Sequence, residues 1–193
     1  MRITTCWALL GSLLFAGAAS AIPIQWTAAS GGNDHWYEAV SANSINWTDS
    51  KAAAEAAGGY LATVTSAAEN AFIAGLVPDY GADAERPYWL GAFQPPGSAA
   101  NVGWQWVTGE AWSYTNWAPG EPTNTNENAL AFAYFATGDA WNNAPTGHTG
   151  YGAFAGYVVE YVREDRTDVP EPASLALVAL GLAGLGWSRH KRV

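Results

Sequence analysis

Hydrophobic and polar positions in the first third of the chain predict a helix between two strands. The alternation from Trp36 to Val40 indicates a half-buried strand. An Ala-rich run from Trp47 to Ala57 favours a helix, and Gly58-Gly59 supplies a C-terminal stop. Tyr60 to Val64 has the composition of a short strand. The structured part of the chain is therefore predicted to begin as strand, helix and strand.

A second helix is predicted directly afterwards. Ser66 and Glu69 have the spacing of a capping box, in which both side chains bond free backbone N–H groups at a helix start. Apolar positions then follow at helical spacing up to Leu76, and the helix is expected to end before Pro78. The two helices thus come early and close together.

The rest of the chain to residue 162 is typical of strands separated by long, turn-rich segments. Helices that come early and strands that come late indicate an α+β architecture rather than alternating βαβ units. Long loops in a compact domain are usually functional, so the segment from Ser113 to Asn128 is a candidate binding loop. The candidate strands are Tyr88–Phe93, Gly103–Val107, Leu130–Phe135 and Tyr157–Val162.

Composition limits the partners and the means of stabilisation. The formal net charge is −9, from 17 acidic and 8 basic residues. Nucleic acid is excluded as a partner, because binding to phosphates needs clustered Lys and Arg. The single cysteine, Cys6, lies near the N-terminus, so the domain is expected to contain no disulfide and to depend on a large core. Tryptophan, with 11 residues in the chain, is expected to supply much of that core.

Residues 1–21 have the features of a secretory signal peptide. Arg2 provides a positive start, an apolar run extends from Cys6 to Ala16, and Ala19-Ser20-Ala21 provides a small-residue cleavage site. The folded domain is therefore predicted to occupy residues 22–162.

The C-terminal end has three parts in a fixed order. Residues 163–172 form a charged linker that ends in the motif Val169, Pro170, Glu171 and Pro172. An apolar segment, 173–188, is shorter than the roughly 20 residues that span a bilayer comfortably, and the basic tail 189–193 favours the cytoplasmic side. The order resembles the PEP-CTERM sorting signal of Gram-negative bacteria. The resemblance implies transient inner-membrane anchoring, processing by an exosortase-type enzyme, and export to the cell surface or extracellular polysaccharide matrix. An ordinary C-terminal anchor is the alternative.

A series of short motifs runs along the chain between Trp36 and Tyr161. They are, in order, Gly58-Gly59-Tyr60-Leu61, Trp89-Leu90-Gly91, Trp104-Gln105-Trp106, Tyr114-x-x-Trp117, Glu121-Pro122, Glu127 and Trp141-Asn142-Asn143. In their order the motifs resemble those of a C-type lectin-like domain. The resemblance implies two helices packed on small antiparallel sheets with a long functional loop. Members of that family usually carry two disulfides, and small or apolar residues stand at the corresponding positions, Ala54 with Val159 among them.

The resemblance also implies a calcium site in the candidate loop. Carboxylate and amide oxygens suit Ca²⁺, and the same oxygens can bond sugar hydroxyls. Thr123 stands where the family has Asn, and Asn143 stands where it has Asp; Pro122 is expected to follow a cis peptide bond, as in the sugar-binding relatives. The implied calcium ligands are Glu121, Asn124, Glu127, Asn142 and Asn143.

Two functions remain open from the sequence. The first is an exported carbohydrate-binding module with calcium as cofactor, which contacts a glycan or exopolysaccharide through Glu121, Asn124, Glu127 and Asn142, with Trp112 stacking on a sugar ring. The alternative is a calcium-independent module for protein binding, adhesion or matrix structure, which the residues at positions 123 and 143 favour. No nucleophile with a matching base stands out in the sequence, so we expect no enzymatic activity.

Overall fold

Strand β8 (Gly156–Tyr161) is the centre of the fold, and all six of its residues are buried. The computed structural model describes residues 22–78, 87–132, 138–149 and 154–162. Strand β8 pairs antiparallel with β2 (Trp36–Ser41) and β3 (Tyr60–Leu61), and parallel with β4 (Tyr88–Phe93). The run Tyr157-Val158-Val159 suits this position, because β-branched and aromatic side chains pack well on both faces of a buried strand.

The remaining described strands extend this sheet on both sides. Strand β1 (Ile24–Gln25) pairs with β2, while β5 (Gln105–Trp106) and β6 (Ala129–Phe132) pair with β4, and β7 (Trp141–Ala144) pairs with β6. The described strands thus form one eight-stranded sheet with the main order β1-β2-β8-β4-β6-β7. Because β4 and β8 run parallel, the expected small antiparallel sheets are joined into one mixed sheet.

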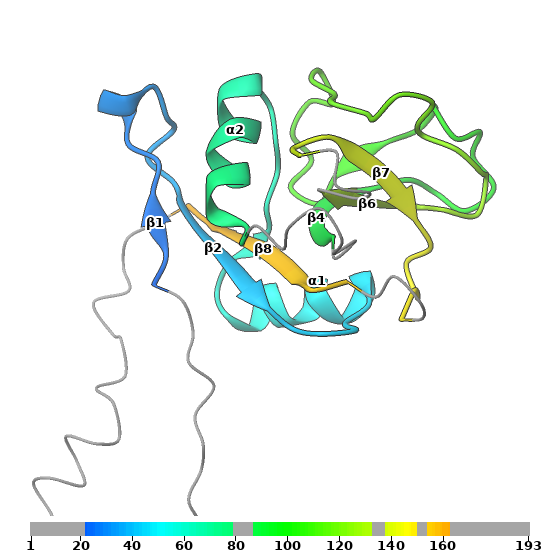
Figure 1. Cartoon of the computed structure of the whole chain (residues 1–193), viewed down its shortest axis with the longest axis horizontal. Helices are drawn as coiled ribbons and strands as arrows, with labels where there is room; N and C mark the ends of the chain where they lie inside the picture. Colours follow the sequence, from blue (N-terminus) through cyan, green and yellow to red (C-terminus); the bar gives the residue numbers. More distant parts are fainter. Residues whose placement is uncertain (1–21, 79–86, 133–137, 150–153, 163–193) are drawn as a thin grey trace, which may run out of the picture.

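Two α-helices lie on opposite sides of β2 and β8 (Figure 1). Helix α1 (Trp47–Ala56) begins at Asn46, whose side chain accepts from the Asp49 backbone N–H, and helix α2 (Ala67–Leu76) begins at Ser66. Side chains of α2 share a core cluster with Val158, whereas those of α1 share another with Val159. Adjacent residues of a strand point to opposite faces, which explains why one strand contacts both helices' clusters. A short 3-10 helix, η1 (Ala28–Ser30), follows β1.

Most predicted elements are present with shifted ends. Strand β4 has the predicted bounds, whereas β3 ends at Leu61 instead of Val64. The difference at β3 arises because the Thr63 backbone N–H donates to the Glu160 side chain, at 2.9 Å, and not to a strand. Strand β7 was not predicted from the hydrophobic pattern. Of the predicted strand Leu130–Phe135, residues 133–135 lie outside the described residues.

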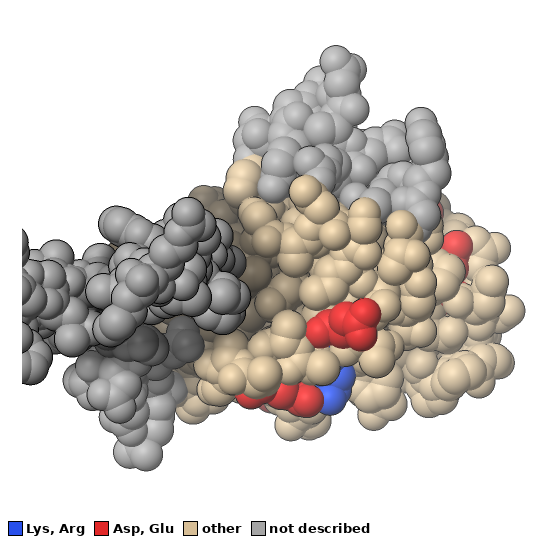
Figure 2. Space-filling view, turned by 90° about the horizontal axis from the view of Figure 1, so that it is seen from below, with Lys and Arg blue, Asp and Glu red and all other residues tan. Residues whose placement is uncertain are grey.

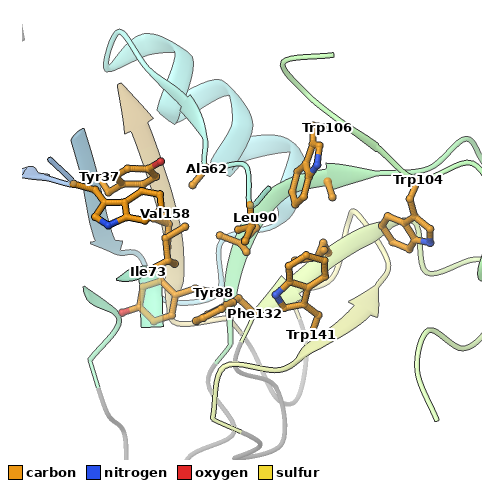
Figure 3. Close-up of a cluster of buried hydrophobic side chains, with 14 of the residues drawn as sticks. Tyr37, Ala62, Ile73, Tyr88, Leu90, Trp104, Trp106, Phe132, Trp141 and Val158 are labelled. Atoms are coloured by element: carbon orange, nitrogen blue, oxygen red, sulfur yellow. The ribbon is translucent and has the colours of Figure 1, made fainter. Parts of the chain in front are cut away.

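The core contains the large aromatic side chains that the composition indicated (Figure 3). Trp89 stacks on Phe154 with ring centroids 3.3 Å apart, and Trp89, Trp106 and Trp141 are fully buried. Ala54 and Val159 belong to the same buried cluster. Where relatives are expected to have a disulfide, this chain therefore has hydrophobic packing.

The predicted signal peptide 1–21, linker 163–172, apolar segment 173–188 and basic tail 189–193 lie outside the described residues. Within the described ranges, the structure contains no helix of the length and apolar character that crossing a membrane requires.

Candidate functional site

The candidate loop runs alongside the edge strand β7. The Ala118 backbone N–H donates to the Trp141 carbonyl, and the Trp141 N–H donates to the Asn116 carbonyl, each at 2.8 Å. Trp117 and Trp141 form an isolated parallel bridge. These backbone contacts place the predicted loop residues next to Asn142 and Asn143 of β7. The structure therefore brings together segments more than twenty residues apart in the sequence.

Asn143 joins two points of the loop through its side-chain amide. Its Oδ1 atom accepts from the Thr123 backbone N–H at 2.9 Å, and its Nδ2 atom donates to the Glu127 carbonyl at 2.9 Å and to the Thr123 carbonyl. The residue is 3% exposed. These three partners determine the orientation of the amide. If it were flipped, its NH₂ group would face the Thr123 N–H and its oxygen would face the two carbonyl oxygens, and none of the bonds could form. Asn143 of β7 thus cross-links two points of the loop.

Glu121 has an unsatisfied carboxylate oxygen. Its Oε2 atom is buried and has no hydrogen-bond partner among the residues that the structure describes. The peptide bond between Glu121 and Pro122 is cis, as expected. Lys51 is the only Lys or Arg in the described ranges, and its Nζ lies 2.5 Å from Glu55 on helix α1. A buried carboxylate oxygen without a donor is unfavourable, so any donor that reached Oε2 of Glu121 would lower that cost.

The other predicted residues differ in their surroundings. Asn142 is buried, and its Oδ1 accepts from the Asn143 backbone N–H at 2.7 Å. Asn124 is exposed and has a positive φ of 57°, a conformation that Asn tolerates better than most residues. Glu127 is half-buried, and its backbone carbonyl receives the bond from Asn143. Two of the five predicted residues are therefore already engaged, through their side-chain amides, in bonds to the backbone.

Trp112 belongs to an aromatic cluster beside the loop. Its ring centroid lies 4.8 Å from that of Trp106 and 5.9 Å from those of Trp104 and Trp141. The three partner rings are labelled in Figure 3. Trp112 is half-buried and packs against the main core cluster. Only the part of its ring that these contacts leave uncovered is available to a ligand.

Comparison with known families decides the identity of this arrangement. The family model described as the lectin C-type domain matches residues 43–149, which is more than half of the chain. The chain belongs to the C-type lectin domain family. A second model, the PEP-CTERM protein-sorting motif, matches residues 168–192 and indicates export and sorting of this lectin-domain protein.

Individual relatives agree with this assignment. A perlucin-like protein of Mytilus galloprovincialis is 30% identical over 100 residues, which cover 51% of this chain and 61% of the relative. The match thus spans less than two thirds of that relative's length. The lectin domain of murine dendritic cell inhibitory receptor 2, solved in complex with N-glycan, has a TM-score of 0.55 and 21% identity, covering 67% of this chain and 91% of its own. A calcium-independent type II antifreeze protein has a TM-score of 0.55 and 20% identity, covering 74% and 95%. These two structures show the same fold.

C-type lectin domains often bind calcium, so the fit of the loop to a calcium ion can be tested on its donors. The described residues contain no group of three or more His, Cys, Asp or Glu that could hold a metal. The decisive residue is Asn143, which presents nitrogen, not oxygen, to the carbonyls of Thr123 and Glu127. An amide NH₂ group is not a ligand for a hard cation. Calcium coordination by the five predicted residues remains a prediction, and the Nδ2 atom of Asn143, which lies where the two carbonyls meet, does not fit it.

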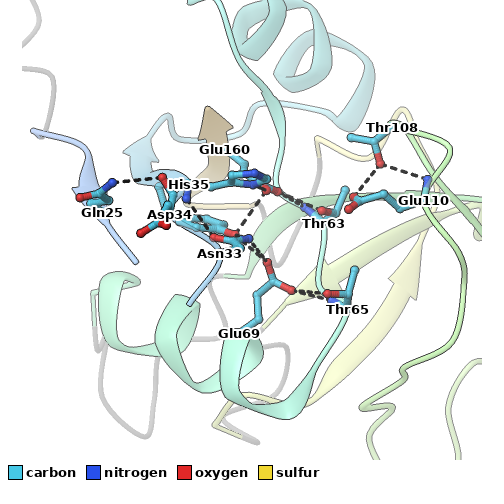
Figure 4. Close-up of polar contacts among 11 residues, drawn as sticks. Gln25, Asn33, Asp34, His35, Thr63, Thr65, Glu69, Thr108, Glu110 and Glu160 are labelled. Atoms are coloured by element: carbon cyan, nitrogen blue, oxygen red, sulfur yellow. Dashed lines mark hydrogen bonds and ion pairs between the residues drawn. The ribbon is translucent and has the colours of Figure 1, made fainter. Parts of the chain in front are cut away.

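A buried polar network in the lectin domain was not predicted from the sequence (Figure 4). Glu160 accepts from the Thr63 N–H and Oγ1 at 2.9 Å, and its Oε1 lies 2.6 Å from His35 Nδ1. The Tyr37 hydroxyl donates to Glu69 at 2.6 Å and lies 3.3 Å from Glu160. His35 is half-buried, with 24% of its side chain exposed. The one signal of the network in the sequence was the charge of Glu160 within an otherwise apolar strand.

Burial determines the protonation behaviour of this network. Loss of solvent raises the pKa of Glu160 above its ordinary value, while hydrogen bonds from Thr63 and His35 act in the opposite direction. Burial, together with the nearby charge of Glu160, also raises the pKa of Tyr37. Glu69, whose predicted role was in a capping box, bonds the Thr65 N–H at 2.7 Å, and the Ser66 hydroxyl accepts from the Glu69 N–H at 3.2 Å. The network thus joins α2 to β2 and β8.

Charged side chains are sparse on the surface of the lectin domain seen from below (Figure 2). Uncharged residues cover most of the described surface in that view, and the acidic side chains lie in separate groups. Such a surface offers hydrogen bonds and apolar contact more than long-range attraction to a highly charged partner.

Proposed function

We propose that this protein is an exported glycan-binding module whose ligand contacts the loop 113–128 and the neighbouring strand β7. The observation that carries the proposal is the buried Oε2 atom of Glu121, which has no donor among the described residues. A sugar hydroxyl is a donor of the right kind, because hydrogen bonds from hydroxyls to carboxylates are short and strong. The half-buried side chain of Glu121 would have to turn Oε2 outward to meet it. Glycan binding of this kind uses the protein's own groups and requires no calcium.

Neighbouring groups support a sugar ligand over an ion. Asn124 is exposed on the same loop and can donate and accept, as hydroxyl pairs require. The half-buried ring of Trp112 supplies an apolar surface for the C–H face of a sugar ring. The face seen in Figure 2 has few charged side chains, which agrees with a neutral polysaccharide.

The sorting motif supports a location for this activity. We infer that an exosortase-type enzyme recognises Val169-Pro170-Glu171-Pro172 and removes the tail, after the apolar segment 173–188 has held the protein in the inner membrane of a Gram-negative bacterium. The mature domain would then reach the cell surface or extracellular polysaccharide matrix. A matrix polysaccharide is accordingly the first ligand class to test.

The alternative is a calcium-independent protein-binding or structural module on the same fold. The observation that favours it concerns Asn143. Its side-chain amide bonds the loop backbone at Thr123 and Glu127, so it is not free to bond a ligand. The C-type lectin family is one of binding domains, so we expect no catalysis from either module.

A binding experiment distinguishes the two. Full-length protein in mild detergent is applied to a glycan array and to matrix polysaccharide, with calcium and with chelator. Glu121→Gln replaces one carboxylate oxygen by an NH₂ group, and it should weaken binding by roughly 10–100-fold, since a hydrogen bond to a charged group contributes about 1.5–3 kcal/mol.

The matched control is Glu55→Gln, which changes an exposed carboxylate on helix α1 in the same way. It should bind like the wild type. Glycan binding that is equal in the wild type and in Glu121→Gln would show that the site lies elsewhere. Failure of the folded protein to bind any glycan would refute the proposed function and leave the protein-binding alternative.

A further inference from the structure

Two backbone carbonyls of the candidate loop converge on one group. The carbonyls of Thr123 and Glu127 both accept from Asn143 Nδ2, although four residues of chain separate them. The segment between them forms a turn at residues 125–126. In many binding loops a cation draws such oxygens together. Here an uncharged NH₂ group occupies the point where they meet.

The other end of the same amide completes the cross-link. Asn143 Oδ1 accepts from the Thr123 N–H at 2.9 Å, so Thr123 is held through both its N–H and its carbonyl. Asn143 itself is positioned by the sheet, where it pairs with Leu130 of β6. Because the residue is 3% exposed, water competes little for these bonds.

An acidic residue at position 143 would reverse the chemistry. A carboxylate can still accept from the Thr123 N–H, but its second oxygen would face the two carbonyls without a hydrogen between them. Three oxygens in that arrangement repel one another unless a cation lies among them. The Asn side chain and a bound cation are therefore alternative ways to hold the same backbone turn.

We propose that the amide of Asn143 replaces calcium as the group that holds residues 123–127, so that this loop is ordered without metal. The inference concerns the loop's stability and does not rest on glycan binding. It departs from the calcium site that the family resemblance implies, and the reason is the single exchange of a carboxylate oxygen for an NH₂ group.

Thermal unfolding of the full-length protein in detergent tests the proposal, with tryptophan fluorescence as readout. The wild type should have the same Tm in millimolar Ca²⁺ and in chelator. Asn143→Asp should lower the Tm in chelator by roughly 5–10 °C, because it loses the bonds of the NH₂ group and adds repulsion. Millimolar Ca²⁺ should restore much of that loss in the Asp variant.

The control is Thr125→Asp, which adds a carboxylate at an exposed position of the same loop. Its Tm should not respond to Ca²⁺, so a general effect of charge is excluded. A Tm of the wild type that rises by several degrees in Ca²⁺ would overturn the proposal, and this result needs no variant to fold. An Asn143→Asp variant as stable as the wild type in chelator would overturn it as well.

Discussion

Glu160 provides a test of how this domain tolerates a buried charge. It is fully buried in β8, yet its two carboxylate oxygens accept from Thr63, His35 and Tyr37. In the wild type the Thr63 N–H donates to Glu160 Oε2 at 2.9 Å, and replacing Glu160 with alanine would leave this buried N–H without an acceptor. The shorter side chain would also open a cavity between β8 and the chain after β3. Breaking a buried polar network of this kind costs about 3–5 kcal/mol.

The two substitutions of Glu160 should differ strongly. For a domain of this size each kcal/mol lowers the Tm by roughly 3–4 °C, so Glu160→Ala should lose roughly 10–20 °C. Glu160→Gln keeps one oxygen for Thr63 and can donate its NH₂ group to an unprotonated His35, while it removes the cost of burying a charge. Its stability at neutral pH should therefore stay within about 2 kcal/mol of the wild type.

The pH dependence has a definite sign. Burial raises the folded-state pKa of Glu160 above its ordinary value of 4.5, so the folded protein holds this proton more tightly than the unfolded chain. The stabilisation that comes from this tighter proton binding is fully present below pH 4.5 and is lost as the pH rises through the folded-state pKa of Glu160. As the pH rises from 4.5 through that pKa, the wild type should therefore lose stability relative to Glu160→Gln. The groups that face Glu160 include Thr63, His35, Tyr37, Tyr60 and Glu69.

Chemical denaturation of the wild type and both variants between pH 4 and pH 8, followed by tryptophan fluorescence, measures these differences. The difference between wild type and Glu160→Gln reports the titration of Glu160 together with its coupling to the groups that face it, because groups distant from Glu160 are common to both. A wild type that gains stability relative to the Gln variant as the pH rises would refute the reasoning. So would a Glu160→Ala variant as stable as the wild type at pH 7.

Two further predictions concern core packing, one beside the loop and one between β2 and β8. Trp141→Phe removes the indole N–H that donates to Asn70 Oδ1 at 2.7 Å and so leaves a buried acceptor unpaired. The free energy of unfolding in urea should fall by about 1–3 kcal/mol. An unchanged urea midpoint would contradict this. Gly156→Ala would place a Cβ 1.9 Å from the Val40 carbonyl oxygen, so it should separate β8 from β2 and lower the Tm markedly. The control is Gly75→Ala, whose added Cβ would meet open space and should leave the Tm nearly unchanged.

Local patterns in the sequence were sufficient for the elements whose signals are local. Strand β4 and the starts of both helices agree with the prediction, because a capping side chain and an apolar run act over a few residues. Strand β7 was not predicted from its pattern, since Asn142 and Asn143 have low strand propensity and their places depend on pairing with β6. The His35–Glu160 contact joins residues 125 apart, which no local pattern indicates.

For the candidate loop, the sequence indicated which residues could form a site, and the tertiary structure decided which hydrogen bonds their side chains make. The order of tryptophan and glycine motifs indicated the family, and with it the loop that contains Glu121 and the strand that contains Asn143. From the sequence alone, Asn143 was an implied calcium ligand at a position where the family has Asp. The fold decided that its amide bonds Thr123 and Glu127, because a side chain's hydrogen bonds depend on which backbone groups the sheet brings within 3 Å of it.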